Sequence, residues 1–219
     1  MNESDFTENV ISVIRTKMAS RNDHSIPEDA DISDFSEVFL FFDYDFQNKN
    51  LPLEELNKQV REMLDFFSNE TENGKLYINY PMVESIKCTN QLPDSNYYTY
   101  TVTRKDCHDF KDYVTKTYNY YKSTDYFIFS IDSKTKTLRP FTPEKEKLIS
   151  ESWKHLNKQN ICKANFICKD INELPESKND INQTNLFENQ ITKYVTNNET
   201  VSILNSFPLF LYEYFKEIF

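Results

Sequence analysis

The chain of 219 residues is acidic, with 25 Lys and Arg against 35 Asp and Glu, a formal charge of −10 and a pI near 4.9. This balance argues against a chain-wide nucleic-acid-binding surface, and the length suits one substantial core rather than two full-sized domains. A single glycine, Gly74, excludes the glycine-rich loops that bind nucleotide phosphates. Aromatic residues make up 15% of the chain, so we expect a core built largely from Phe and Tyr.

Four cysteines at irregular spacing, with no secretory signal ahead of them, indicate reduced thiols in a cytoplasmic protein. A zinc site would need short paired spacing, which Cys107, Cys162 and Cys168 do not have. No apolar stretch approaches the roughly 20 residues that span a membrane. We therefore expect a cytoplasmic protein without a membrane segment.

The first strong element along the chain is the apolar run Val38–Phe42, which ends in Asp43-Tyr-Asp45. Because the run lacks polar alternation, it predicts a strand buried on both faces, as in a parallel sheet. Apolar residues at helical spacing then predict a helix over Leu53–Ser68 that packs one face on the sheet. With a second strand over Leu76–Tyr80, this order indicates a right-handed βαβ unit.

The second half of the chain is predicted to be rich in helix. Helical spacing covers Asp109–Tyr121, and Thr142-Pro-Glu has the capping residues of a helix start. The apolar run Tyr126–Ile131 fits either a strand or a buried helical turn. Two further helices are predicted over Leu186–Val195 and Thr200–Phe219. The expected fold is α/β, with a short, mostly parallel sheet and flanking helices in residues 1–100 and a helical half, residues 101–219, packed on it.

Asp43 and Asp45 are candidate metal ligands at the carboxyl end of the first strand, where open α/β sheets bind their ligands. Side chains two apart on an extended backbone point the same way, and paired carboxylates suit Mg²⁺ or Mn²⁺. Glu84, just past the second strand, would add a third carboxylate, and Lys87 could contact a phosphate or pair with Glu84. The alternatives are a solvated turn at the aspartates and a Glu84 that only complements a helix dipole.

The run Val38–Asp45, the helix that follows it and the segment Asn73–Glu84 resemble a bacterial TOPRIM-like family. They are similar to the RloB-type and OLD-associated proteins of abortive-infection and anti-phage operons. The resemblance covers residues 37–87 and, more loosely, 200–215. It implies a TOPRIM-like sheet and a Mg²⁺-dependent or Mn²⁺-dependent nuclease, with Asp43, Asp45 and Glu84 as metal ligands and Lys87 near the phosphate. It also implies a nucleic-acid substrate and an ATPase partner subunit.

The sequence departs from that family at one point. TOPRIM proteins carry a catalytic Glu at the end of an earlier strand, often in a Val-Glu-Gly context. Only 36 residues precede Glu37, and Glu3, Glu8 and Glu28 lack both the apolar strand and the glycine. An incomplete metal centre would be a poor catalyst. Two functions therefore stay open: a metal-dependent nuclease, or a non-catalytic TOPRIM-like protein that binds an ATPase or a phage factor.

Other chemistries find less support in the sequence. Haloacid-dehalogenase phosphatases need a hydroxyl residue two positions after the second aspartate, where this chain has Gln47. None of His24, His108 and His155 lies near a nucleophile elbow. The tyrosine clusters between Tyr97 and Tyr121 could stack on bases, but core packing accounts for most aromatic residues in so aromatic a chain.

Overall fold

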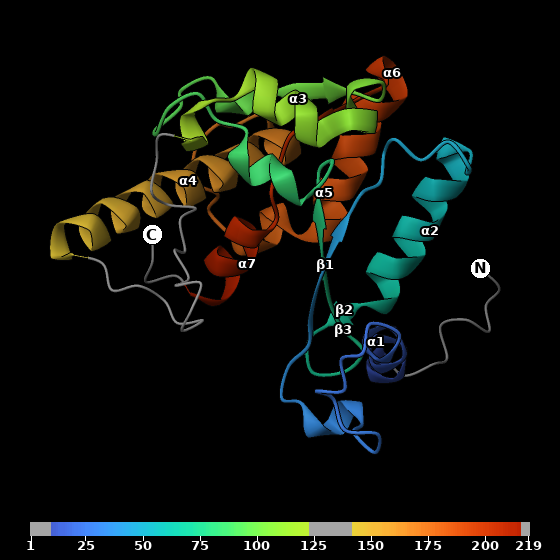
Figure 1. The fold of residues 1–219 in the computed structure, drawn as a ribbon. Helices are drawn as coiled ribbons and strands as arrows, with labels where there is room; N and C mark the ends of the chain where they lie inside the picture. The colour runs from blue at the N-terminus through green and yellow to red at the C-terminus, as the bar shows by residue number, and fades with distance from the viewer. Residues whose placement is uncertain (1–9, 123–141, 216–219) are drawn as a thin grey trace. The chain divides into compact units, whose positions relative to one another are not determined.

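The computed structural model describes residues 10–122 and 142–215 of the chain (Figure 1). These residues form a mixed α/β fold with one three-stranded and one two-stranded sheet. The helices are α1 (Val10–Ala19), α2 (Leu53–Phe66), α3 (Phe110–Thr117), α4 (Pro143–Lys169), α5 (Gln183–Gln190), α6 (Thr196–Asn198) and α7 (Phe207–Tyr214). The strands are β1 (Phe39–Asp43), β2 (Ser68–Asn69), β3 (Gly74–Asn79), β4 (Thr101–Thr103) and β5 (Thr200–Ser202). Short 3-10 helices and one π-helical segment connect them.

The chain divides into two compact units. Of the residues that the structure describes, the first unit comprises those up to Phe41 together with Pro52–Tyr77, and the second comprises Phe42–Leu51 together with those from Ile78 onward. Strands β1 and β3 each pass from the first unit into the second. The loop after β1 and the end of β3 belong to the second unit. The division at residue 100 that the sequence indicates stays a prediction.

Helix α2 is the main helix of the first unit and follows the predicted apolar stripe. Leu56, Val60 and Leu64 are buried, as is the polar Asn57 beside them. The exposed face of the helix carries the charged residues Lys58, Arg61, Glu62 and Asp65. Pro52 precedes the first turn, where Glu54 and Glu55 complement the helix dipole. The helix ends at Phe66, two residues before the predicted end.

A tight connection between β2 and β3 depends on the one glycine of the chain. The two strands pair antiparallel, with Asn69 opposite Gly74. Gly74 has a φ of +103°, which side-chain-bearing residues rarely adopt, and a Cβ there would lie 3.3 Å from Val38 Cγ1. The glycine therefore meets a backbone and a packing requirement at once.

The three-stranded sheet has the order β1-β3-β2, so it is small and mixed. β1 and β3 run parallel, because Val38 O accepts from Lys75 N at 2.9 Å and Asn79 O accepts from Tyr44 N at 3.0 Å. Both β2–β3 and β4–β5 are antiparallel. The predicted mostly parallel sheet is therefore not what the described residues form.

Strand β1 is also less buried than its sequence predicts. Within the part of the chain that the structure describes, it lies at the edge of its sheet, and only Leu40 is fully buried. Phe41 and Phe42 are 39% and 41% exposed. The apolar run indicated the strand correctly but not its place in the sheet, because hydrophobicity alone does not distinguish a central strand from an edge strand.

Helix α4 organises the second unit. Thr142 caps it by accepting a hydrogen bond from Lys145 N, and Pro143 occupies the first turn, as predicted. Its C-terminal half is buried, and α5 and α7 lie against it (Figure 1). The fully buried apolar side chains of these three helices are Leu156, Ile161, Ala164, Ile167, Leu186, Phe187 and Leu209.

The last predicted helix, Thr200–Phe219, is divided in the structure. Its first residues form β5, which pairs antiparallel with β4 so that Val201 lies opposite Val102. Helix α7 begins only at Phe207. The β-branched residues Thr200 and Val201 favour a strand, and Pro208 suits the first turn of a helix, which explains the break. The apolar run Tyr126–Ile131 lies outside the described residues.

A lysine occupies the interior of the second unit. Lys163 is fully buried, and its ammonium donates to Tyr97 O at 3.0 Å and to Tyr100 O at 2.6 Å. It also lies 4.7 Å from the centre of the Tyr97 ring. Burial lowers the pKa of Lys163 well below its usual value, while the nearby Cys88 and Asp94 act in the opposite direction.

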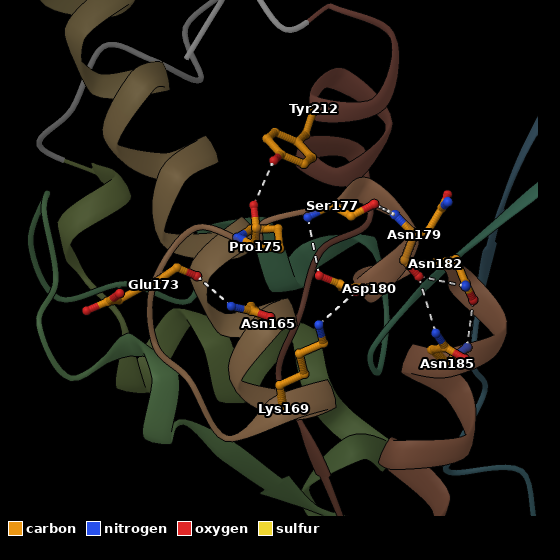
Figure 2. Close-up of polar contacts among 10 residues, drawn as sticks. All are labelled: Asn165, Lys169, Glu173, Pro175, Ser177, Asn179, Asp180, Asn182, Asn185 and Tyr212. Carbon is orange, nitrogen blue, oxygen red and sulfur yellow. Dashed lines mark hydrogen bonds and ion pairs between the residues drawn. The ribbon is translucent and has the colours of Figure 1, made fainter.

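Side-chain hydrogen bonds and an ion pair hold the polar segment after α4 in place (Figure 2). Lys169 and Asp180 form an ion pair at 2.7 Å. Ser177 and Asp180 form a capping box at the start of a short 3-10 helix. Tyr212 of α7 donates to Pro175 O at 3.4 Å, which ties this loop to the C-terminal helix.

Across residues 10–122 and 142–215, no helix is both long enough and apolar enough to cross a membrane.

Candidate acidic site

Asp43 ends β1 and is held by two hydrogen bonds. Its carboxyl oxygen accepts from Val83 N at 2.9 Å and from Asn79 Nδ2 at 3.3 Å. The residue as a whole is solvent-accessible, but protein partly surrounds the carboxyl group, and this burial raises the pKa of Asp43. The two hydrogen bonds lower the pKa, and the negative charges of Glu84 and Asp45 raise it again. Glu84 and Asp45 therefore both lie within electrostatic reach of Asp43.

Asp45 does not continue the extended backbone on which the sequence prediction for its side chain depends. Its φ is 55°, in the left-handed region, so the extended backbone that would align its side chain with that of Asp43 has already ended. Tyr44 and Phe46 on either side are buried and stack at 5.6 Å between ring centres. Asp45 is exposed between them and accepts a hydrogen bond from Gln47 Nε2 at 2.5 Å.

Glu84 lies in the 3-10 helix Val83–Lys87, directly after β3. Its carboxylate forms an ion pair with Lys111 of α3 at 3.3 Å, and its side chain is only 16% exposed. The ammonium of Lys87 lies 5.4 Å from the centre of the Tyr121 ring. Lys111 carries no sequence signal for this role, because it is one of many surface lysines and is 27 positions away from its partner along the chain.

The donor chemistry of the site suits Mg²⁺ or Mn²⁺, but the side chains do not form a coordinating set. Among the residues that the structure describes, no group of three or more His, Cys, Asp and Glu side chains could hold a metal ion. Asp45 has a left-handed backbone, and Glu84 forms an ion pair with Lys111. Metal binding by Asp43, Asp45 and Glu84 stays a prediction, and it requires these side chains to move.

Other chemistry-bearing residues lie away from this site. A pocket of about 160 Å³ is lined in part by Asp94, Tyr97, His155, Lys158 and Gln159, and it includes none of the predicted site residues. The four cysteines are free thiols, and burial raises the pKa of Cys107 to about 12. A thiol with so high a pKa is a poor nucleophile near neutral pH.

Buried polar residues surround Asp43 on the protein side, and sequence reasoning did not find them. Asn79, the last residue of β3, is 2% exposed, and its side chain joins Asp43 to Ser206. A polar residue at the end of an apolar strand is a weak signal that could have drawn attention to Asn79. The chain matches no protein-family model, and no curated protein and no solved structure shows significant similarity to it.

Proposed function

We propose that this protein is a metal-dependent, TOPRIM-like nuclease component of a bacterial anti-phage or abortive-infection system. The observation that carries the proposal is the carboxylate of Asp43, which Val83 N and Asn79 Nδ2 hold at the carboxyl end of β1. Burial is the main cause that raises the pKa of Asp43, and the negative charges of Glu84 and Asp45 raise it further. A divalent cation would relieve this repulsion, and hard oxygen ligands are what Mg²⁺ and Mn²⁺ prefer.

Asp43, Asp45 and Glu84 are the residues that would hold the cation, which would supply charge stabilisation to phosphodiester hydrolysis. Glu84 would have to leave Lys111. The side chain of Lys111 is 75% exposed, and partly exposed ion pairs contribute at most about 1 kcal/mol. Lys87 is the candidate contact for a substrate phosphate.

The resemblance further supports a nucleic-acid substrate and an ATPase partner subunit, and the irregularly spaced cysteines support a cytoplasmic setting. The formal charge of −10 means that the nucleic acid would have to bind through a local basic surface or through the metal, since the chain as a whole repels phosphate.

The test is cleavage of DNA and RNA by the purified chain in the presence of Mg²⁺ or Mn²⁺. Asp43→Asn removes the charge while keeping the size of the side chain, and it should abolish cleavage. Asp65→Asn, at an exposed position of α2, is the matched control and should leave cleavage unchanged. Cleavage that persists in Asp43→Asn would exclude this site as the catalytic centre.

The second candidate is a non-catalytic TOPRIM-like protein that binds an ATPase or a phage factor. Its support is that Glu84 is paired with Lys111 and Asp45 with Gln47, so both carboxylates have protein partners without a metal. For this candidate we expect weak or no cleavage at any Mg²⁺ or Mn²⁺ concentration. Co-purification with the ATPase of the same operon, unaffected by Asp43→Asn, would then favour it over the nuclease.

A further inference from the structure

The segment between β5 and α7 contains two buried polar residues, Asn205 and Ser206, which are 2% and 1% exposed. We propose that this dipeptide is a positioning device for the acidic site, holding Asp43 from one side and the turn that carries Glu84 from the other. The metal-binding consequence rests on the proposed function, whereas the positioning itself does not.

The connection to Asp43 passes through Asn79. Ser206 donates twice to Asn79 Oδ1, from its backbone nitrogen at 3.1 Å and from its hydroxyl at 2.9 Å. Because two donors fix the oxygen of this amide toward Ser206, its NH₂ group must face the opposite way, toward Asp43. Asn79 Nδ2 donates to Asp43 Oδ1 at 3.3 Å. Ser206 thereby orients Asn79 so that its NH₂ group, and not its oxygen, faces the carboxylate of Asp43.

The connection to Glu84 passes through its two neighbours. Asn205 Nδ2 donates to Val83 O at 3.0 Å and to Ser85 Oγ at 3.1 Å, so it holds the residues immediately before and after Glu84. Ser85 Oγ in turn lies 3.2 Å from Leu204 O. Val83 also uses its N–H to donate to Asp43. The two connections therefore meet at Val83.

The dipeptide is itself held by α4. Asn205 N donates to Asn160 Oδ1 at 3.2 Å, and the same oxygen accepts from Tyr97 OH at 2.7 Å. Asn160 is fully buried, so the chain of hydrogen bonds runs from the interior of the second unit to the solvent-accessible carboxylate of Asp43. Apolar residues could fill this space without needing partners. The presence of polar residues at these buried positions is explained if they serve to orient Asp43 and Glu84.

The test combines two variants with two matched controls. Ser206→Ala removes only the hydroxyl donor to Asn79, and Asn205→Ala removes both donors to the Glu84 turn. Ser202→Ala is a control at a buried serine of the preceding strand β5, whose backbone pairs with the side chain of Gln190. Asn165→Ala is a control at a buried asparagine of α4, whose amide donates to Glu173 O.

The first measurement is hydrogen exchange of the Val83 amide by NMR without metal. Weakening one hydrogen bond should speed this exchange about three- to tenfold in both test variants, since such a bond contributes roughly 0.5–1.5 kcal/mol. The controls should leave it unchanged. If Asn205→Ala fails to fold, the exchange rate in Ser206→Ala alone tests the inference. Unchanged Val83 exchange in a folded test variant overturns the inference.

The second measurement is the affinity for Mn²⁺ by electron paramagnetic resonance. We expect the test variants to bind Mn²⁺ several-fold more weakly than the wild type and the controls to match the wild type. Faster Val83 exchange with unchanged Mn²⁺ affinity would overturn the inference that the dipeptide positions Asp43 and Glu84 as metal ligands. If the wild type binds no Mn²⁺, the proposed function fails, and the exchange measurement still decides whether the dipeptide positions the site.

Discussion

Replacing the buried Lys163 with methionine should change how stability depends on pH. Because the pKa of Lys163 is lowered in the folded state, the unfolded chain binds more protons than the folded chain between the folded pKa and about 10.4. The stability of the wild type must therefore rise with pH across this window, and this contribution levels off below the folded pKa, where both states bind the proton. Methionine has a similar size and no proton to bind, so Lys163→Met removes this contribution.

The magnitude follows from the one proton involved. Where the unfolded chain binds one proton more than the folded chain, the free energy of unfolding changes by about 1.4 kcal/mol per pH unit. At the alkaline end the neutral amine still has two hydrogens for Tyr97 O and Tyr100 O, which lie 3.0 and 2.6 Å away, whereas methionine leaves both carbonyls without this donor. The free energy of unfolding of Lys163→Met should therefore fall furthest below that of the wild type at high pH.

Urea unfolding of both proteins from pH 7 to pH 10.5, followed by circular dichroism, measures the effect. Contributions from tyrosine and cysteine titration are largely common to the two chains, although Cys88 interacts with Lys163 and should be checked with Cys88→Ala in both backgrounds. The stability of the wild type relative to Lys163→Met should increase with pH. Parallel curves over the whole range would refute the reasoning.

Three further predictions concern packing, the ion pair and the glycine. Leu64→Ala should lower the free energy of unfolding by about 2–5 kcal/mol in urea titrations, because it removes a buried side chain from α2, whereas Lys58→Ala at an exposed position should change it little. Lys111→Met should free Glu84 and raise the affinity for Mn²⁺ up to about fivefold, the equivalent of a roughly 1 kcal/mol ion pair, and an unchanged or lower affinity would contradict a metal role for Glu84. Gly74→Ala should lower the melting temperature by an amount equivalent to at least about 1 kcal/mol, because alanine is strained at a φ of +103°.

Local patterns in the sequence predicted the features that depend on local physics. The apolar stripe of α2 and the Thr142-Pro143 start of α4 were confirmed, since helical periodicity and capping act over one or two turns. The strand at Val38–Phe42 was found for the same reason. The exposure of this strand at the edge of the sheet was not predicted, because exposure depends on which strands lie beside it.

The candidate site was predictable only in part. Asp43 ends β1 and Glu84 follows β3, and these two strands pair in parallel. The joint role of Asp43 and Glu84 in a site stays a prediction. The direction of Asp45 depends on a single left-handed residue, which the Asp-x-Asp pattern does not encode. Ser206 reaches Asn79 across 127 positions, and one sequence gives no sign of such a contact.

The left-handed backbone at Asp45 also restricts which residues can replace it. With a φ of 55°, most side chains there strain the backbone by about 1–2 kcal/mol, whereas asparagine and glycine tolerate the conformation. An alanine substitution would therefore combine loss of the carboxylate with backbone strain between two buried aromatic residues, and its effect on activity could be mistaken for a catalytic role. The substitution Asp45→Asn removes the charge and keeps a side chain that tolerates this backbone, so the chemistry of the position has to be studied with that variant.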